Sequence, residues 1–167
     1  MDPERSGPIP SPDDMIELGR AIGSRLFEGA VVGLAGPLGA GKTTLARGIA
    51  EGMGLDDGYL VSSPTYIIMQ NYPCGDLEMC HLDLYRIEGV GDLDSTGYRD
   101  ALGKGRVLVV EWPEKEPAVL PEQHLLVEIA YCGESREVTL KPVGDRYVSL
   151  VEDISFPHTK SDGNKWP

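Results

Sequence analysis

The residues with the clearest chemical meaning form one short run, GPLGAGKTT, from Gly36 to Thr44. Their spacing matches the phosphate-binding pattern GxxxxGK[ST]. The glycines let the backbone curl so that its N–H groups can point at phosphate oxygens, and the helix that follows adds its positive N-terminal end. Lys42 supplies a cation for the β- and γ-phosphates, and Thr43 offers a hydroxyl to Mg²⁺. The run therefore predicts that the chain binds a nucleoside triphosphate together with magnesium.

A phosphate-binding loop of this kind also needs an acidic side chain near the metal, usually at the end of a buried strand. Glu111 follows four apolar residues in VLVVE, and Asp83 lies inside the segment CHLDLY. Alternation along a strand would place His81, Asp83 and Tyr85 on one face, which is polar enough to line a site. Either carboxylate could serve the site or could be a solvated strand residue. For His81, a structural histidine is the preferred interpretation over a general base.

The elements that must position these residues predict an α/β fold: a P-loop NTPase core with a mixed parallel and antiparallel sheet flanked by helices. The apolar runs on either side of the loop supply its buried strand and its amphipathic helix. Short links predict two antiparallel hairpins beside this parallel core. The predicted strands span residues 30–36, 65–73, 77–87, 106–112, 124–132 and 136–143, and the predicted helices span 11–29, 42–54 and 91–102.

The chain length of 167 residues suits one domain. We expect residues 1–10 to form a flexible arm, residues 11–151 to form a single P-loop ATPase domain, and residues 152–167 to form a disordered tail. Ser11 is expected to cap the first helix, with Pro12 at its first position.

Composition indicates the cellular compartment and the kind of partner that we expect. The formal net charge of −12 would repel RNA from most of the surface, so another protein is expected to hold any nucleic acid. No run of 18 apolar residues predicts a membrane span, and the N-terminus lacks the pattern of a secretory signal. Three cysteines without CxxC spacing indicate free thiols in a reducing compartment, so we expect a cytoplasmic protein.

Several classes of nucleotide-binding protein fit the loop but differ elsewhere. A GTPase should carry the base-selecting pattern NKxD, and the one Asn-Lys pair, in NKWP, lacks the Asp. A small-molecule or nucleoside kinase should have an arginine-rich lid, but the arginines between residues 84 and 110 do not cluster. A motor would need a longer chain. A kinase, and a nucleotide-dependent switch without useful hydrolysis, remain as alternatives to an ATPase.

Four segments in this order, GPLGAGKTTLARG, SSPTYIIMQNY, HLDLYRI and VLVVEW, resemble the bacterial TsaE family, also called YjeE. The resemblance extends from Ser11 to Lys141. It implies a magnesium-dependent P-loop ATPase, weakly active alone, that works with the proteins TsaB and TsaD. Together they attach threonylcarbamoyl to the adenosine next to the anticodon of ANN-decoding tRNAs. Another subunit performs the transfer, so this chain would meet tRNA only indirectly.

The same resemblance implies roles for individual residues. Thr43 and Glu111 would hold Mg²⁺, Lys42 would bind phosphates, and Asp83 would orient the attacking water or the water shell of the metal. The residues expected to contact the nucleotide are Ser11, Gly39, Ala40, Gly41, Lys42, Thr43, Thr44, Thr65 and Trp112.

Two positions depart from the family pattern. Pro37 stands where an acidic residue is common, and Tyr66 stands where Phe is common. Proline removes one backbone N–H, but the N–H groups expected to cradle phosphate begin at Gly39, so little loss is expected.

Overall fold

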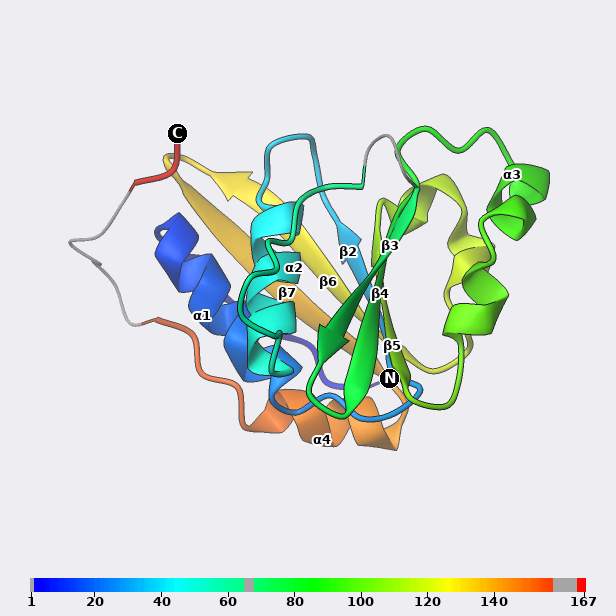
Figure 1. Cartoon of the computed structure of the whole chain (residues 1–167). Coiled ribbons are helices and arrows are strands. Elements are labelled where there is room, and N and C mark those ends of the chain that lie inside the picture. The colour runs from blue at the N-terminus through cyan, green and yellow to red at the C-terminus, as the bar shows by residue number, and fades with distance from the viewer. Residues whose placement is uncertain (1, 65–67, 158–164) are drawn as a thin grey trace.

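A single mixed sheet forms the centre of the molecule in the computed structural model, which describes residues 2–64, 68–157 and 165–167 (Figure 1). The strand order is β1-β7-β6-β2-β5-β4-β3. The strands are β1 (Arg5–Ile9), β2 (Val31–Ala35), β3 (Met69–Cys74), β4 (Leu77–Asp83), β5 (Arg106–Glu111), β6 (His124–Cys132) and β7 (Ser135–Val143). The helices are α1 (Pro12–Gly23), α2 (Lys42–Gly52), α3 (Val90–Ser95) and α4 (Asp145–Glu152), with short 3₁₀ turns at Tyr98–Ala101, Pro113–Lys115 and Pro117–Val119.

The centre of the sheet is parallel and its two sides are antiparallel. β2 pairs in parallel with β5 and β6, and β4 pairs in parallel with β5. β3, β7 and β1 add antiparallel strands. The α/β prediction with a mixed sheet and two hairpins is confirmed. Parallel strands lie buried beneath helices on both faces, which explains why the segments of β2 and β5 are almost continuously apolar.

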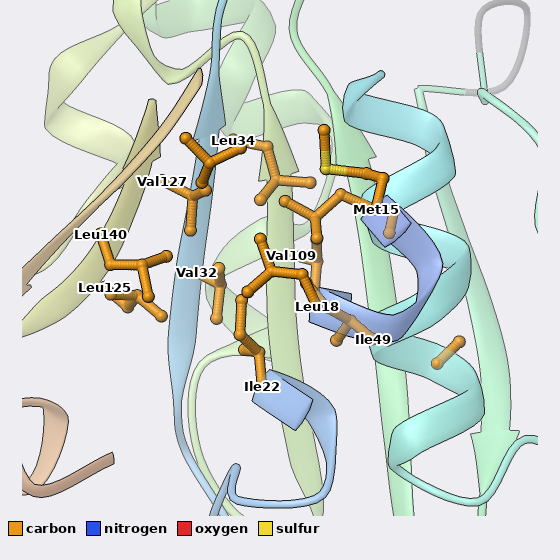
Figure 2. Close-up of a cluster of buried hydrophobic side chains, with 14 of the residues drawn as sticks. Met15, Leu18, Ile22, Val32, Leu34, Ile49, Val109, Leu125, Val127 and Leu140 are labelled. Atoms are coloured by element: carbon orange, nitrogen blue, oxygen red, sulfur yellow. The ribbon is translucent and has the colours of Figure 1, made fainter. Parts of the chain in front are cut away.

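One face of the sheet is covered by α1 and α2 (Figure 2). Met15, Leu18 and Ile22 form the predicted apolar stripe of α1, and they pack toward Val32 and Val109 in the sheet. The Ser11 hydroxyl caps α1 by accepting a hydrogen bond from the N–H of Asp14 at 3.2 Å. The predicted cap is confirmed, but the helix ends at Gly23 and not at Gly29, because the chain turns through residues 24–29 before β2.

The opposite face carries a second core under α3, built from residues such as Leu82, Leu93 and Val110. The single helix predicted for residues 91–102 is wrong. α3 ends at Ser95, and a separate 3₁₀ turn begins at Tyr98. Gly97 lies between them with a φ of 76°, a left-handed conformation that interrupts the helix.

The strand predicted to continue to Ile87 stops instead at Asp83. The Oδ1 atom of Asp83 accepts a hydrogen bond from the backbone N–H of Tyr85 at 2.9 Å. This contact is an Asx turn, which diverts the chain from the sheet. Asp83 therefore occupies the carboxyl end of β4, and Tyr85 lies in the connection that follows.

Both ends of the chain are more ordered than predicted. The flexible arm assigned to residues 1–10 is wrong for Arg5–Ile9, which form β1 along β7. The disordered tail assigned to residues 152–167 is wrong for the described parts, because Ile154 is 1% exposed and Phe156 and Trp166 pack on the core. The guanidinium of Arg5 donates to the carbonyls of Val151 and Glu152, so β1 and the end of α4 hold each other. Side-chain contacts between distant segments stabilise both ends.

Thiol reactivity offers a test of this packing. Cys74 and Cys80 are buried, and burial raises the pKa of each thiol to about 11, whereas Cys132 is exposed. Since the thiolate is the reactive form, we expect one fast-reacting thiol in the native protein and three after unfolding, measured with a chromogenic disulfide reagent. Cys132→Ser should leave no fast thiol. Two fast thiols in the native wild-type protein would contradict the packing around β3 and β4.

Among the described residues, no helix combines the length and the apolar character needed to cross a bilayer.

Candidate functional site

A cavity of about 480 Å³ opens where the parallel strands end and α2 begins. The carboxyl ends of β2, β5 and β4 lie side by side there, which is where α/β sheets bind ligands. The cavity is lined by Pro12, Leu38, Gly39, Gly41, Lys42, Thr43, Thr44, Ser63, Asp83, Tyr85, Glu111, Trp112, Trp166 and Pro167.

The loop between β2 and α2 is fixed by glycine geometry and by one buried arginine. Gly41 has a φ of 115°, in the left-handed region, and a Cβ added at Gly36 would lie 2.6 Å from the carbonyl oxygen of Ile129. Arg136, on β7 and 4% exposed, donates to the carbonyl oxygens of Ala40 at 3.1 Å and Gly39 at 3.4 Å. Arg136 thus keeps these two carbonyl groups turned away from the cavity. In this conformation, other backbone N–H groups of the loop can face the cavity.

Lys42 is the first residue of α2 and is 5% exposed. Its Nζ donates to the carbonyl oxygens of Gly36 at 2.6 Å and Pro37 at 2.8 Å, and it lies 3.8 Å from the centre of the Trp112 ring. Burial lowers the pKa of Lys42, although Glu111 and other nearby carboxylates oppose that shift. A concentrated positive charge in a partly desolvated cavity suits a polyphosphate.

The predicted metal residues meet directly. The Oγ1 atom of Thr43 donates to the Glu111 carboxylate, with distances of 3.0 Å to Oε1 and 3.2 Å to Oε2. Glu111 is 2% exposed, and its Oε2 lies 2.6 Å from Nε2 of His81, which is completely buried. His81 therefore fixes the orientation of the carboxylate from behind, and the Glu111 oxygens face the Thr43 hydroxyl.

Asp83 lies beside Glu111, because these two residues are partners in the parallel pairing of β4 and β5. Its Oδ2 accepts a hydrogen bond from the Ser63 hydroxyl at 2.7 Å, and Oδ1 accepts from the N–H of Tyr85. Both oxygens are thereby positioned at the edge of the cavity. A carboxylate held in this way could accept a proton from water or orient it.

Trp112 is the one described residue other than glycine with a positive φ, at 62°. A left-handed conformation is unfavourable for a bulky side chain, and such residues cluster at functional sites. This turn directly after β5 brings the indole over Lys42, and the Tyr85 ring packs against it with centres 5.1 Å apart. The strain thus places an aromatic wall on the cavity beside the two carboxylates.

The structure brings most of the sequence-predicted site residues together. Those that line the cavity are Gly39, Gly41, Lys42, Thr43, Thr44, Asp83, Glu111 and Trp112. Ser11 does not line it, since its hydroxyl caps α1, although the adjacent Pro12 does. Ala40 is fully buried behind the loop, and its N–H donates to the carbonyl of Pro37. Thr65 lies outside the described residues.

Four residues of the site carried no decisive signal in the sequence. The sequence favours a structural role for His81, and its contact with Glu111 depends on the register of β4 and β5. Ser63 lies in the quoted segment SSPTYIIMQNY, but it is not among the predicted site residues. Arg136 and Trp166 reach the site from segments far from the loop in the chain. The alternation along the strand, which places His81 and Asp83 on one polar face, is the nearest indication in the sequence that His81 lies close to the site.

The residues present fit a magnesium triphosphate. Mg²⁺ prefers oxygen ligands and keeps several waters, so one hydroxyl and one carboxylate suffice beside phosphate oxygens. Thr43 and Glu111 supply such a pair. Among the described residues, no group of three or more His, Cys, Asp or Glu side chains could hold a metal without help from a ligand.

Comparisons with known proteins agree on one family. The family model described as "Threonylcarbamoyl adenosine biosynthesis protein TsaE" matches residues 9–138. The chain is 36% identical over 147 residues to the tRNA threonylcarbamoyladenosine biosynthesis protein TsaE of Bacillus subtilis, covering 87% of this chain and 90% of that protein. For the protein of the same name from Streptomyces coelicolor, identity is 38% over 152 residues, with coverages of 84% and 97%.

A solved structure extends the similarity to the whole fold. The crystal structure of Bacillus subtilis YdiB superposes with a TM-score of 0.75 at 32% sequence identity, covering 92% of this chain and 95% of that one.

Proposed function

Since this chain belongs to the TsaE family of tRNA threonylcarbamoyladenosine biosynthesis proteins, we propose that it is the ATP-binding and ATP-hydrolysing subunit of that pathway. The observation that carries the proposal is the contact between Thr43 and Glu111 beside Lys42. The chain binds Mg–ATP in the cavity, and hydrolysis of this ATP supports the turnover of a complex that the chain forms with TsaB and TsaD.

Each of the central residues has one task in this proposal. Lys42 binds the β- and γ-phosphates, and the loop from Gly39 to Thr44 supplies N–H groups around them. Thr43 and Glu111 hold Mg²⁺, which when bound neutralises the charge that develops on the phosphate oxygens. Asp83 orients the attacking water and accepts its proton.

His81 acts through Glu111. Its ring keeps the carboxylate turned toward Thr43, so the pair stays positioned for the metal. Such an orienting partner behind a metal ligand typically changes metal affinity by 10- to 100-fold when removed.

The charge of the chain supports an indirect role toward tRNA. A net charge of −12 disfavours direct binding of a polyanion and suits docking to a basic protein surface. In this proposal the chain meets tRNA only through the complex, another subunit performs the transfer of threonylcarbamoyl, and this chain supplies ATP hydrolysis in the cytoplasm.

A reconstituted reaction tests the proposal. With TsaB, TsaD, tRNA, the threonylcarbamoyl donor and Mg–ATP present, we expect many modified tRNAs per complex only when this chain is added, measured by nucleoside analysis of the tRNA. Replacing ATP with a non-hydrolysable analogue should stop the reaction after the first turnover.

Two other outcomes would decide against the proposal. Equal turnover with the analogue would indicate a switch that needs only nucleotide binding. Transfer of the γ-phosphate to an added small molecule or nucleoside, without TsaB and TsaD, would indicate a kinase.

A further inference from the structure

Trp166, the second-last residue of the sequence, lines the cavity and lies outside the region matched by the family model. Its position is fixed by two contacts. The indole Nε1 donates to the carbonyl oxygen of Ile9 at 2.9 Å, and the guanidinium of Arg136 lies 4.4 Å from the ring centre. The ring is half-buried, so one part of it remains available to a ligand.

The six-membered ring of Trp166 contacts the phosphate-binding loop itself. A Cβ added at Gly41 would lie 2.7 Å from its Cη2 atom, so the ring fits there only because residue 41 is glycine. Arg136, which packs on the ring, also bonds the carbonyls of Gly39 and Ala40. Trp166 lines this cavity, but Arg136 does not. The part of the indole that faces the cavity is therefore not covered by Arg136.

The sheet order assigns the two ends of the cavity different tasks. Asp83 and Glu111 end β4 and β5, on one side of β2. In the proposed function they mark the γ-phosphate end. Trp166 contacts Ile9 of β1 and Arg136 of β7, two strands that lie on the other side of β2 in the sheet; the strand order can be followed in Figure 1. A nucleotide whose terminal phosphate lies toward the carboxylates must direct its nucleoside away from them. Trp166 lines the same cavity from the side of β1 and β7.

We propose that Trp166 binds the nucleoside part of the nucleotide by packing its indole against the base or ribose. The inference rests on the proposed nucleotide site. Stacking uses the π-face that every base has, so Trp166 contributes affinity and not a choice between adenine and guanine. Arg136 acts as a positioning residue, because it holds both the loop and the ring.

Two ligands separate a nucleoside contact from a phosphate contact: Mg–ATP and Mg–tripolyphosphate, which lacks base and ribose. For Trp166→Ala we expect the dissociation constant of Mg–ATP to rise by about 5- to 100-fold, with that of Mg–tripolyphosphate unchanged, measured by calorimetry on the full chain. Trp166→Phe keeps an aromatic face and should retain most of the affinity for Mg–ATP.

Tyr131→Ala is the matched control. Tyr131 also packs on Arg136, with its ring centre 4.5 Å from the guanidinium, but it does not line the cavity. Its hydroxyl donates to the carbonyl of Leu38 in the loop. Removing the Tyr131 side chain should therefore weaken the binding of Mg–ATP and of Mg–tripolyphosphate by the same factor, so that the ratio of the two dissociation constants stays unchanged.

Every other pattern overturns the inference. An unchanged affinity of Trp166→Ala for Mg–ATP would show that the ring contacts no nucleoside. Tighter binding of Mg–ATP would show that the ring competes for the nucleoside position, and an equal loss for both ligands would show that it supports only the loop. If wild-type protein binds neither ligand, the proposed function fails with it, and that result differs from all of the above because it needs no variant.

Discussion

Replacing Lys42 with alanine is expected to lower ATP turnover by at least about 100-fold, the typical effect of removing one preorganised electrostatic group from an active site. Lys42 is the only lysine or arginine among the described residues that line the cavity. The charged side chains that also line the cavity, those of Asp83 and Glu111, are negative and would repel phosphate if no cation opposed them. Steady-state release of inorganic phosphate, with and without TsaB and TsaD, measures the loss.

The lowered pKa of Lys42 adds a second readout. Burial moves the pKa below the ordinary value of 10.5, so in the free protein the amine loses its proton at lower pH than an exposed lysine does. A bound triphosphate favours the charged amine and raises its pKa again. Wild-type protein should therefore take up protons when it binds ATP at alkaline pH, and Lys42→Ala should lack this uptake. Calorimetry in buffers of different ionisation enthalpy measures it.

Lys115→Ala is the control for the loss of a positive charge near the site. Lys115 is exposed and lies 5.4 Å from the Tyr85 ring centre, but it does not line the cavity. We expect it to change ATP turnover by less than about threefold, because exposed charges interact weakly in water. Full turnover in Lys42→Ala would contradict the placement of the phosphates on α2.

The residues that could be assigned to the site from the sequence share a local origin. Lys42 and Thr43 follow a buried strand and open a helix, so their positions depend on only a few neighbouring residues. Glu111 ends another buried strand, and parallel strands bring their carboxyl ends to the same edge of the sheet. Periodicity and turn chemistry are sufficient for such residues.

The remaining parts of the site depend on contacts that no local pattern contains. Arg136 reaches the loop carbonyls across almost 100 positions of chain, and the indole of Trp166 bonds Ile9 near the opposite end of the sequence. The strand β1 reads as a loose arm because RSGPI contains Pro and Gly, yet pairing with β7 at the sheet edge orders it. For β1, tertiary contacts override local propensity.

The packing of α1 against α2 also depends on contacts that no local sequence pattern contains. Gly19 and Gly23 on α1 face Gly48 and Gly52 on α2, spaced four residues apart on each helix. A Cβ added at these positions would lie 2.1 to 2.7 Å from backbone atoms of the opposite helix. The two backbones therefore touch, and each glycine is required by its neighbour across the interface rather than by its own helix.

Gly48→Ala is expected to lower the free energy of unfolding by about 3 kcal/mol, at the upper end of the range for overpacked cores. Its Cβ would lie 2.4 Å from the carbonyl oxygen of Ile16, which is backbone and cannot rotate away. The helices must separate, which opens the packing of α1 on the sheet. Urea unfolding measures the change, and the corresponding fall in Tm is roughly 10 °C.

Gly91→Ala is the matched control, because Gly91 is also helical but has no atom within 4 Å of an added Cβ. Alanine is the better helix former, so the free energy of unfolding of this variant should stay within about 0.5 kcal/mol of the wild-type value or rise slightly.

Since α2 begins with Lys42, moving this helix should also draw Thr43 away from Glu111 and reduce ATP turnover in the folded Gly48→Ala protein. Lys42→Ala should lose turnover while keeping its resistance to urea. Wild-type urea resistance in Gly48→Ala would show that the two helices do not pack backbone to backbone.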